Sequence, residues 1–109
     1  MIIDSHCHLL HSKSEKMIPE IISDAKLNDV QVLLNISTHP DEFDKIIDVS
    51  NQYKNVYSSI GIHPHSAFLI SEENYKLMSQ LVKNPKVVGV GETGLDFYYN
   101  NSERNDQLE

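Results

Sequence analysis

Short runs rich in isoleucine and valine alternate along this chain with longer segments in which apolar side chains recur at helical spacing. The apolar runs lie at residues 2–5, 30–37, 56–62 and 87–91, and each run predicts a strand. The intervening segments, at residues 17–29, 38–53 and 71–84, predict amphipathic helices. This order predicts an α/β fold whose parallel sheet is built through right-handed crossovers.

Two kinds of closure agree with this order: an open doubly wound sheet, and the first part of a (β/α)8 barrel of the TIM type. An open sheet that binds a dinucleotide would carry a glycine-rich turn directly after its first strand. Histidines occupy that place here, in the segment DSHCH at residues 4–8. At the other end, residues 100–109 are polar and contain Ser102, where a further helix can begin.

Length, charge and cysteine content limit the class of protein. The 109 residues fit one modest domain, and no apolar run is long enough to span a membrane. The start has no basic flank before an apolar stretch, so we expect no signal peptide, and the single cysteine suits a cytoplasmic protein. A net charge of −7 argues against a broad electrostatic surface for nucleic acid, although bound divalent cations can neutralise a few phosphates locally.

The first motif places Asp4, His6 and His8 at alternate positions where the first expected strand ends. Side chains two residues apart on an extended backbone point to the same face, so both imidazoles can reach one cation at roughly 2.0–2.1 Å. Asp4 is placed to hold a neighbouring ring through its other nitrogen. Cys7 points the opposite way and is expected to be a small buried side chain. Taken alone, the two histidines fit a surface turn equally well.

Two further motifs follow the third and fourth expected strands. GIHPH at residues 61–65 presents His63 and His65 after Gly61, which allows close backbone approach. GETG at residues 91–94 places Glu92 between two glycines. Each motif alone fits an ordinary loop.

The placement of the three motifs favours a common site. All three lie at the carboxyl ends of parallel strands, the edge of the sheet where α/β proteins and barrels gather their active sites. We therefore expect a shared metal or catalytic site at this edge. Its candidate residues are His6, His8, His63, His65 and Glu92.

Three other polar residues near these motifs are expected to have no part in the chemistry. His11 and His39 fall in loops and are expected to be surface residues without partners. Asp96, which precedes three aromatic residues, is expected to order the loop after Glu92.

The blocks DSHCH at residues 4–8, GIHPH at 61–65 and VGVGETGLDFY at 88–98 resemble the TatD family of metal-dependent hydrolases, within the amidohydrolase-like superfamily. The resemblance implies a barrel that hydrolyses ester bonds, typically the phosphodiesters of DNA. It implies that His6 and His8 bind one metal ion, and that Glu92 is a catalytic carboxylate that bridges to a second ion. It also implies that His63 lies near the substrate phosphate, whereas His65 is more variable. Such mixed nitrogen and oxygen ligands suit Zn²⁺, Mn²⁺ or Mg²⁺.

A complete barrel of this type needs roughly 250 residues, so residues 1–109 are expected to form its N-terminal part, the first four βα units. The family's two later histidines and its late aspartate have no counterpart in this sequence. We therefore expect a truncated deoxyribonuclease, whose partners are DNA or another phosphodiester and a second chain that supplies the missing half barrel. Two alternatives stay open: a non-catalytic half-barrel remnant, and an amidohydrolase-like deacylase of aminoacyl esters.

Overall fold

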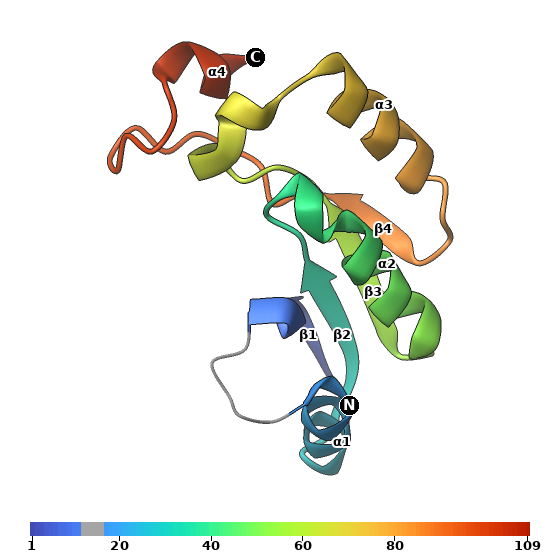
Figure 1. Cartoon of the computed structure of the whole chain (residues 1–109). Helices are drawn as coiled ribbons and strands as arrows, with labels where there is room; N and C mark the ends of the chain where they lie inside the picture. Colours follow the sequence, from blue (N-terminus) through green and yellow to red (C-terminus); the bar gives the residue numbers. More distant parts are fainter. Residues whose placement is uncertain (12–16) are drawn as a thin grey trace.

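The chain forms one parallel sheet whose successive strands are joined by helices (Figure 1). The structure is a computed structural model that describes residues 1–11 and 17–109. Each neighbouring pair of strands is parallel, and the strands lie side by side in chain order. They are β1 (Ile2–Cys7), β2 (Val30–Ile36), β3 (Val56–Ile60) and β4 (Val87–Val90).

Helical segments follow each strand. Short 3₁₀ turns come directly after the first three strands, and longer helices then lead to the next strand. The turns are η1 (Leu9–His11), η2 (Pro40–Glu42) and η3 (Pro64–Leu69), and the helices are α1 (Ile18–Leu27), α2 (Phe43–Gln52), α3 (Glu72–Leu81) and α4 (Arg104–Leu108). The predicted order of strands and helices is confirmed, including a helix after Ser102.

β2 and β4 each end one residue earlier than predicted, and the ends of β1 and β3 differ by two residues. β1 runs to Cys7, two residues further than predicted, because Cys7 still pairs with Asn35 of β2. β3 ends at Ile60, two residues earlier than predicted. The N–H group of Gly61, the next residue, donates to the Ser37 side chain and leaves the strand ladder.

The hydrophobic core lies between the sheet and the helices. Val56, Ser58 and Ile60 are fully buried, and alternate residues of a strand share one face, so this is the face of β3 that the helices cover. The core has two clusters, one of Leu9, Ile22, Leu33, Val49 and Val56, the other of Phe43, Ile46, Ile60 and Ile62. Each cluster contains a residue of β3 packed against helical residues, so β3 is the strand that anchors the sheet to the helices.

The two outer strands carry exposed apolar side chains. β1 and β4 form the edges of the sheet, and Ile2, Ile3, Val88 and Val90 are each more than half exposed. An edge strand presents unpaired backbone groups with which another strand can pair. The sheet therefore has two open edges at which further strands fit. Among the described residues, no helix is long and apolar enough to cross a membrane.

We predict that Ile60→Ala lowers the free energy of unfolding by about 2–5 kcal/mol, because it leaves a cavity in the second core cluster. Urea unfolding followed by circular dichroism measures the change. Ile3→Ala on the open edge is the matched control and should cost about 1 kcal/mol or less. Equal losses for the two variants would contradict the position of the core.

Candidate metal centre

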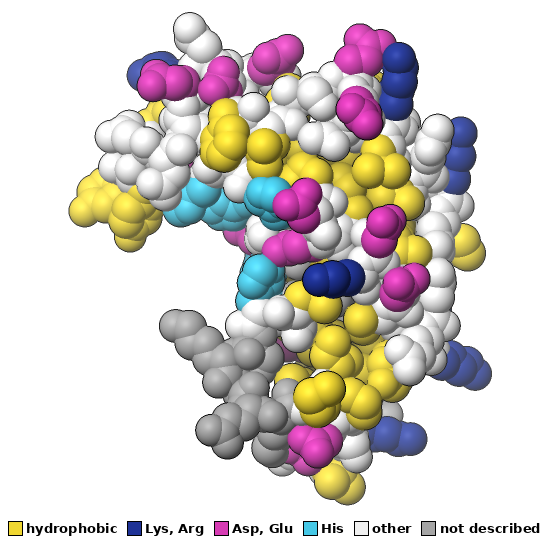
Figure 2. Space-filling view, in the orientation of Figure 1, with side chains coloured by type: hydrophobic (Ala, Val, Ile, Leu, Met, Phe, Trp, Pro, Cys, Tyr) yellow, Lys and Arg dark blue, Asp and Glu magenta, His cyan; other side chains and the backbone are white. Residues whose placement is uncertain are grey.

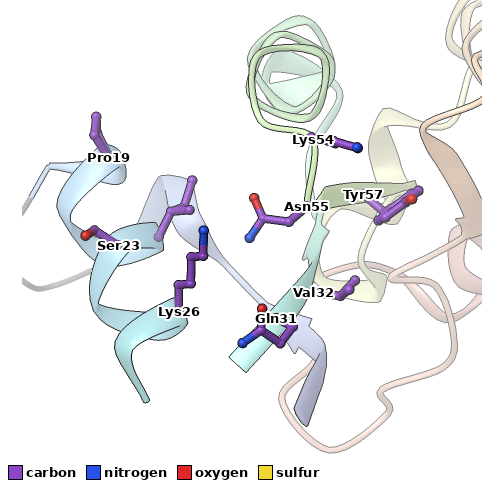
Figure 3. Close-up of a pocket in the computed structure, with 9 residues that line it drawn as sticks. Pro19, Ser23, Lys26, Gln31, Val32, Lys54, Asn55 and Tyr57 are labelled. Atoms are coloured by element: carbon purple, nitrogen blue, oxygen red, sulfur yellow. The ribbon is translucent and has the colours of Figure 1, made fainter. Parts of the chain in front are cut away.

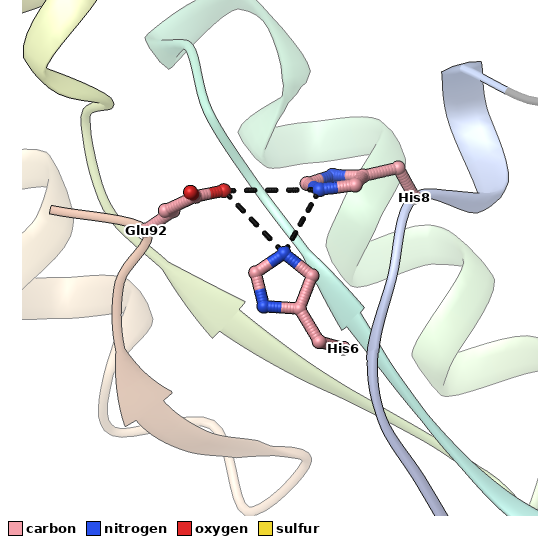
Figure 4. Close-up of side chains that lie close together, drawn as sticks. All are labelled: His6, His8 and Glu92. Atoms are coloured by element: carbon pink, nitrogen blue, oxygen red, sulfur yellow. Dashed lines mark hydrogen bonds and ion pairs between the residues drawn. The ribbon is translucent and has the colours of Figure 1, made fainter.

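Three side chains from two distant parts of the sequence converge at the carboxyl edge of the sheet (Figure 4). His6 lies near the end of β1, His8 directly follows that strand, and Glu92 follows β4. The His6 and His8 Nε2 atoms are 3.1 Å apart, and they lie 3.5 and 3.7 Å from Glu92 Oε2. Donors around a tetrahedral Zn²⁺ with bonds of about 2.0–2.1 Å are separated by roughly 3.3 Å. The chemistry and spacing of these three atoms therefore fit one divalent cation.

The orientation of the His8 ring is set by β2. Its Nδ1 atom lies 3.1 Å from the carbonyl oxygen of Ile36. A carbonyl oxygen can only accept, so His8 Nδ1 carries the proton and Nε2 keeps its lone pair toward the cluster. The prediction that Asp4 holds a histidine ring is wrong. Asp4 Oδ1 accepts from the backbone N–H group of His6 at 3.0 Å, the local bond that an aspartate side chain readily makes to the backbone two residues on.

His63 faces the same cluster with the opposite hydrogen-bonding character. Its Nδ1 atom accepts from the backbone N–H group of His65 at 3.1 Å, so Nε2 carries the proton in the neutral ring. His63 Nε2 lies 3.6 Å from Glu92 Oε1. The two oxygens of Glu92 therefore face different partners: Oε2 faces the Nε2 atoms of His6 and His8, and Oε1 faces the Nε2–H group of His63.

A buried serine, which the sequence reasoning missed, connects the ends of β2, β3 and β4. The carbonyl oxygen of Ser37 accepts from the N–H group of Glu92 at 3.0 Å. The Ser37 hydroxyl accepts from the N–H group of Gly61 at 2.9 Å and donates to the Gly61 carbonyl oxygen at 3.1 Å. Ser37 is completely buried. It thereby ties Glu92 to the start of the loop that carries His63.

Gly61 lies against the backbone of Gly91. A Cβ atom at residue 61 would be 2.5–2.8 Å from the carbonyl group and Cα atom of Gly91, so no side chain fits there. The Ser59 hydroxyl donates to the Gly91 carbonyl oxygen at 2.8 Å, and the Gly91 N–H group donates to Ile60. The prediction of close backbone approach at Gly61 is confirmed, and this contact sets the position of Glu92.

His65, the fifth candidate, turns away from the cluster. Its Nε2 atom lies 2.6 Å from Asp96 Oδ2, although its ring still packs edge-on to His63 with centroids 4.4 Å apart. Asp96 also accepts from the N–H groups of Tyr98 and Tyr99, so its predicted role in ordering this loop is confirmed. The pKa of Asp96 lies below its ordinary value. The hydrogen bond from His65 is the largest cause, and the bonds from the backbone N–H groups of Tyr99 and Tyr98 add to it. Asp96 therefore remains an acceptor at neutral pH.

Two histidines predicted to be without partners do have them. His11 Nε2 contacts the Glu42 carboxylate, which also accepts from the Thr38 N–H group at 3.0 Å. Burial alone would raise the pKa of Glu42, but the hydrogen bonds from Thr38 and His11 lower it overall. His39 Nδ1 accepts from the N–H group of Asp41 and caps η2. The His11 partner is 31 residues away in sequence, which is why local pattern did not reveal it.

Cys7 is half-buried, and its thiol donates to the Leu34 carbonyl oxygen at 3.3 Å. Burial, followed by the nearby charge of Asp4, raises the pKa of Cys7 to about 12. A thiol with so high a pKa is a poor nucleophile and a poor metal ligand near neutral pH. Cys7 is therefore a packing residue between β1 and β2, as its position in the motif predicted.

The cluster borders a hollow in the surface. A cleft of about 390 Å³ is lined by His6, Leu34, Ser59 and Glu92 among others. Figure 2 shows the histidine side chains gathered along this hollowed side. A larger pocket of about 540 Å³ lies where β2 and β3 begin, lined by residues such as Lys26, Gln31 and Tyr57 (Figure 3). The larger pocket contains none of the candidate residues, so the smaller cleft is the one that borders the candidate metal ligands.

Comparisons with known proteins identify the family of this chain. Residues 3–109 match the model of the TatD related DNase family. The chain is 38% identical to an uncharacterized metal-dependent hydrolase of Buchnera aphidicola, over 94% of this chain and 40% of that protein. It is 33% identical to the 3'-5' ssDNA/RNA exonuclease TatD of Cronobacter turicensis, over 74% of this chain and 31% of that protein.

Structural similarity supports the same fold. The crystal structure of a hydrolase TatD family protein from Entamoeba histolytica superposes with a TM-score of 0.81 at 26% identity, over 98% of this chain and 42% of that chain. This chain therefore spans about two fifths of the length of the proteins it resembles. Its four parallel βα units are part of a barrel, and the prediction of a partial (β/α)8 barrel is confirmed.

We predict that the purified chain binds Zn²⁺ or Mn²⁺ and that His6→Ala/His8→Ala and Glu92→Ala each weaken the binding. The loss should exceed the roughly 10–100-fold that follows removal of an outer-shell partner. Isothermal titration calorimetry measures it. His39→Ala, which removes an imidazole outside the cluster, should bind as the wild-type chain does. Equal affinity in all variants would mean that the ions bind elsewhere.

We predict that Ser37→Ala lowers the free energy of unfolding by about 1–3 kcal/mol. The buried N–H group and carbonyl oxygen of Gly61 both lose their hydrogen bond to the Ser37 hydroxyl. The change should also weaken metal binding by about tenfold, because the Gly61 backbone, against which Gly91 and hence Glu92 are positioned, loses its anchor. Ser79→Ala removes a helical hydroxyl that donates to the Tyr75 carbonyl oxygen, and it is the matched control. Unchanged metal affinity in Ser37→Ala would contradict the positioning role.

Proposed function

We propose that this chain, which belongs to the TatD related DNase family of metal-dependent hydrolases, carries the first half of a metal site that hydrolyses the phosphodiester bonds of DNA. The observation that carries the proposal is the convergence of His6, His8 and Glu92 into one group of three donors. Two imidazole nitrogens and a carboxylate oxygen form a donor set suited to Zn²⁺, Mn²⁺ or Mg²⁺. The single half-buried cysteine agrees with a cytoplasmic location.

Each residue has a distinct part in this proposal. His6, His8 and Glu92 would together hold one divalent ion. Glu92 Oε1, which lies on the side of His63, would contribute to a second ion or accept a proton from an attacking water. When bound, divalent ions lower the pKa of a coordinated water and stabilise charge on the attacking and leaving oxygens.

His63 contributes a hydrogen-bond donor to the substrate. Its Nδ1 atom is occupied by a backbone N–H group, so Nε2–H is the donor that faces Glu92. A phosphodiester oxygen placed beside Glu92 would accept from this group. Removing His63 is therefore expected to affect substrate binding more than metal binding.

The overall charge bears on how DNA would bind. With a net charge of −7, the chain as a whole repels a polyanion. Bound cations and neutral N–H donors then provide the contacts to phosphate, so we infer that the metal strengthens binding of the substrate. The name of the Cronobacter relative, a 3'-5' ssDNA/RNA exonuclease, agrees with a nucleic-acid substrate.

The open edges of the sheet favour a site completed by further βα units. β1 and β4 both offer unpaired backbone, and the relatives are more than twice as long as the aligned part. We propose that further βα units, which carry the later ligands, complete the barrel at these edges. The alternative is a non-catalytic half barrel.

We predict that the chain, mixed with a polypeptide covering the later part of the Buchnera relative, cleaves a labelled single-stranded oligonucleotide in the presence of Mn²⁺. Glu92→Gln should lower the rate by about 10²–10⁴-fold, as expected when a group that accepts a proton is lost. Gel electrophoresis of the products measures cleavage, and Glu73→Gln, an exposed carboxylate on α3, is the matched control.

Two other results would change this interpretation. Cleavage of an aminoacyl ester without cleavage of the oligonucleotide would favour a deacylase. A mixture that binds metal through His6 and His8 but turns over neither substrate would favour the non-catalytic half barrel.

A further inference from the structure

Two tyrosines on the loop after Glu92 are unusually exposed. The side chains of Tyr98 and Tyr99 are 83% and 65% exposed, and their rings meet edge to face with centroids 4.9 Å apart. Phe97, next to them, is covered by the guanidinium group of Arg104 at 4.5 Å from its centroid. Clustered exposed aromatic side chains on a folded protein mark a binding surface more often than scattered ones do.

The backbone below the two tyrosines is held in place. Asp96 accepts from the N–H groups of Tyr98 and Tyr99 at 3.0 and 3.2 Å. The side chain of Gln107 bonds both backbone groups of Asp96, accepting at 2.7 Å and donating at 3.1 Å. Ser102 donates to the His65 carbonyl oxygen at 3.0 Å and so ties this loop to η3. The rings are therefore displayed on an ordered support, which lowers the entropy lost on binding.

A continuous row of rings leads from the metal centre to the tyrosines. His63 Nε2 lies 3.6 Å from Glu92 Oε1, and the His63 and His65 centroids are 4.4 Å apart. The His65 centroid is in turn 5.6 Å from that of Tyr99. Figure 2 shows hydrophobic side chains projecting beside the row of histidines. A ligand with its phosphate at Glu92 and His63 would extend along this row to the tyrosines.

We propose that Tyr98 and Tyr99 form a stacking platform for a base of a single-stranded nucleic acid whose backbone lies at the metal centre. The proposal rests on the proposed function. It adds the residues by which the chain would bind a nucleic acid more tightly than a phosphodiester that has no base. Aromatic rings stack on any base, because every base has a π-face. The platform does not depend on positive charge, which suits a chain with a net charge of −7. Base selectivity is therefore broad, and unpaired strands are preferred.

The test compares binding of a fluorescein-labelled single-stranded DNA oligonucleotide with binding of an abasic oligonucleotide of the same length, by fluorescence anisotropy. The wild-type chain should bind the base-containing strand about tenfold more tightly. Tyr98→Leu/Tyr99→Leu should abolish this difference, whereas Tyr98→Phe/Tyr99→Phe should keep it, because phenyl rings still stack. Tyr75→Leu is the matched control, since Tyr75 is 69% exposed on α3 and lies outside the row.

The measurement is repeated with His6→Ala/His8→Ala and without divalent ions, so that stacking is separated from metal chemistry. Retention of the preference for bases in that variant supports the platform even if the cleavage test fails. Equal affinity of the wild-type chain for the two oligonucleotides, or binding of neither, overturns it. The same preference in the leucine variant, with an unchanged circular dichroism spectrum, also overturns it.

Discussion

The hydrogen bond from the N–H group of Glu92 to the carbonyl oxygen of Ser37 is the contact on which the arrangement of the candidate site depends. It crosses the end of β3 and brings the loop after β4 to the end of β2. It can form only because Gly61, between them, has no side chain to keep the Gly91 backbone away. The Glu92 carboxylate then reaches the two histidines at the end of β1, although β1 and β4 lie at opposite edges of the sheet. Close backbone packing, more than any ion pair, therefore makes the three donors meet.

Much of this fold and the common edge of the motifs could be predicted from the sequence, because the relevant signals are local. Apolar runs and helical periodicity identify strands and helices, and alternating strands and helices imply a parallel sheet. In a parallel sheet the carboxyl ends of all strands lie at one edge, so motifs that follow strands must approach one another. The two-residue spacing of His6 and His8 likewise fixes their common face. These inferences need no knowledge of which strand lies beside which.

Apart from the strand ends, the predictions that failed concern hydrogen-bond partners. Asp4 bonds a nearby backbone group and no ring, while the distant carbonyl oxygen of Ile36 orients His8. The pairs His11–Glu42 and His65–Asp96 each join residues separated by 31 positions. Such pairs depend on the register of neighbouring strands and on the path of each loop. Ser37 has an ordinary side chain in an ordinary strand end, so nothing in its local sequence distinguishes it.

The order of the strands has a kinetic consequence. Because the sheet order follows the chain order, each of the strands β2 to β4 pairs with the strand made before it. The two histidines are therefore in place once β1 and β2 have paired, while Glu92 arrives with β4. A divalent ion held by all three residues would bind tightly only after β4 has paired. It would thus report the pairing of β4, and it would stabilise that late state by mass action without accelerating the earlier steps.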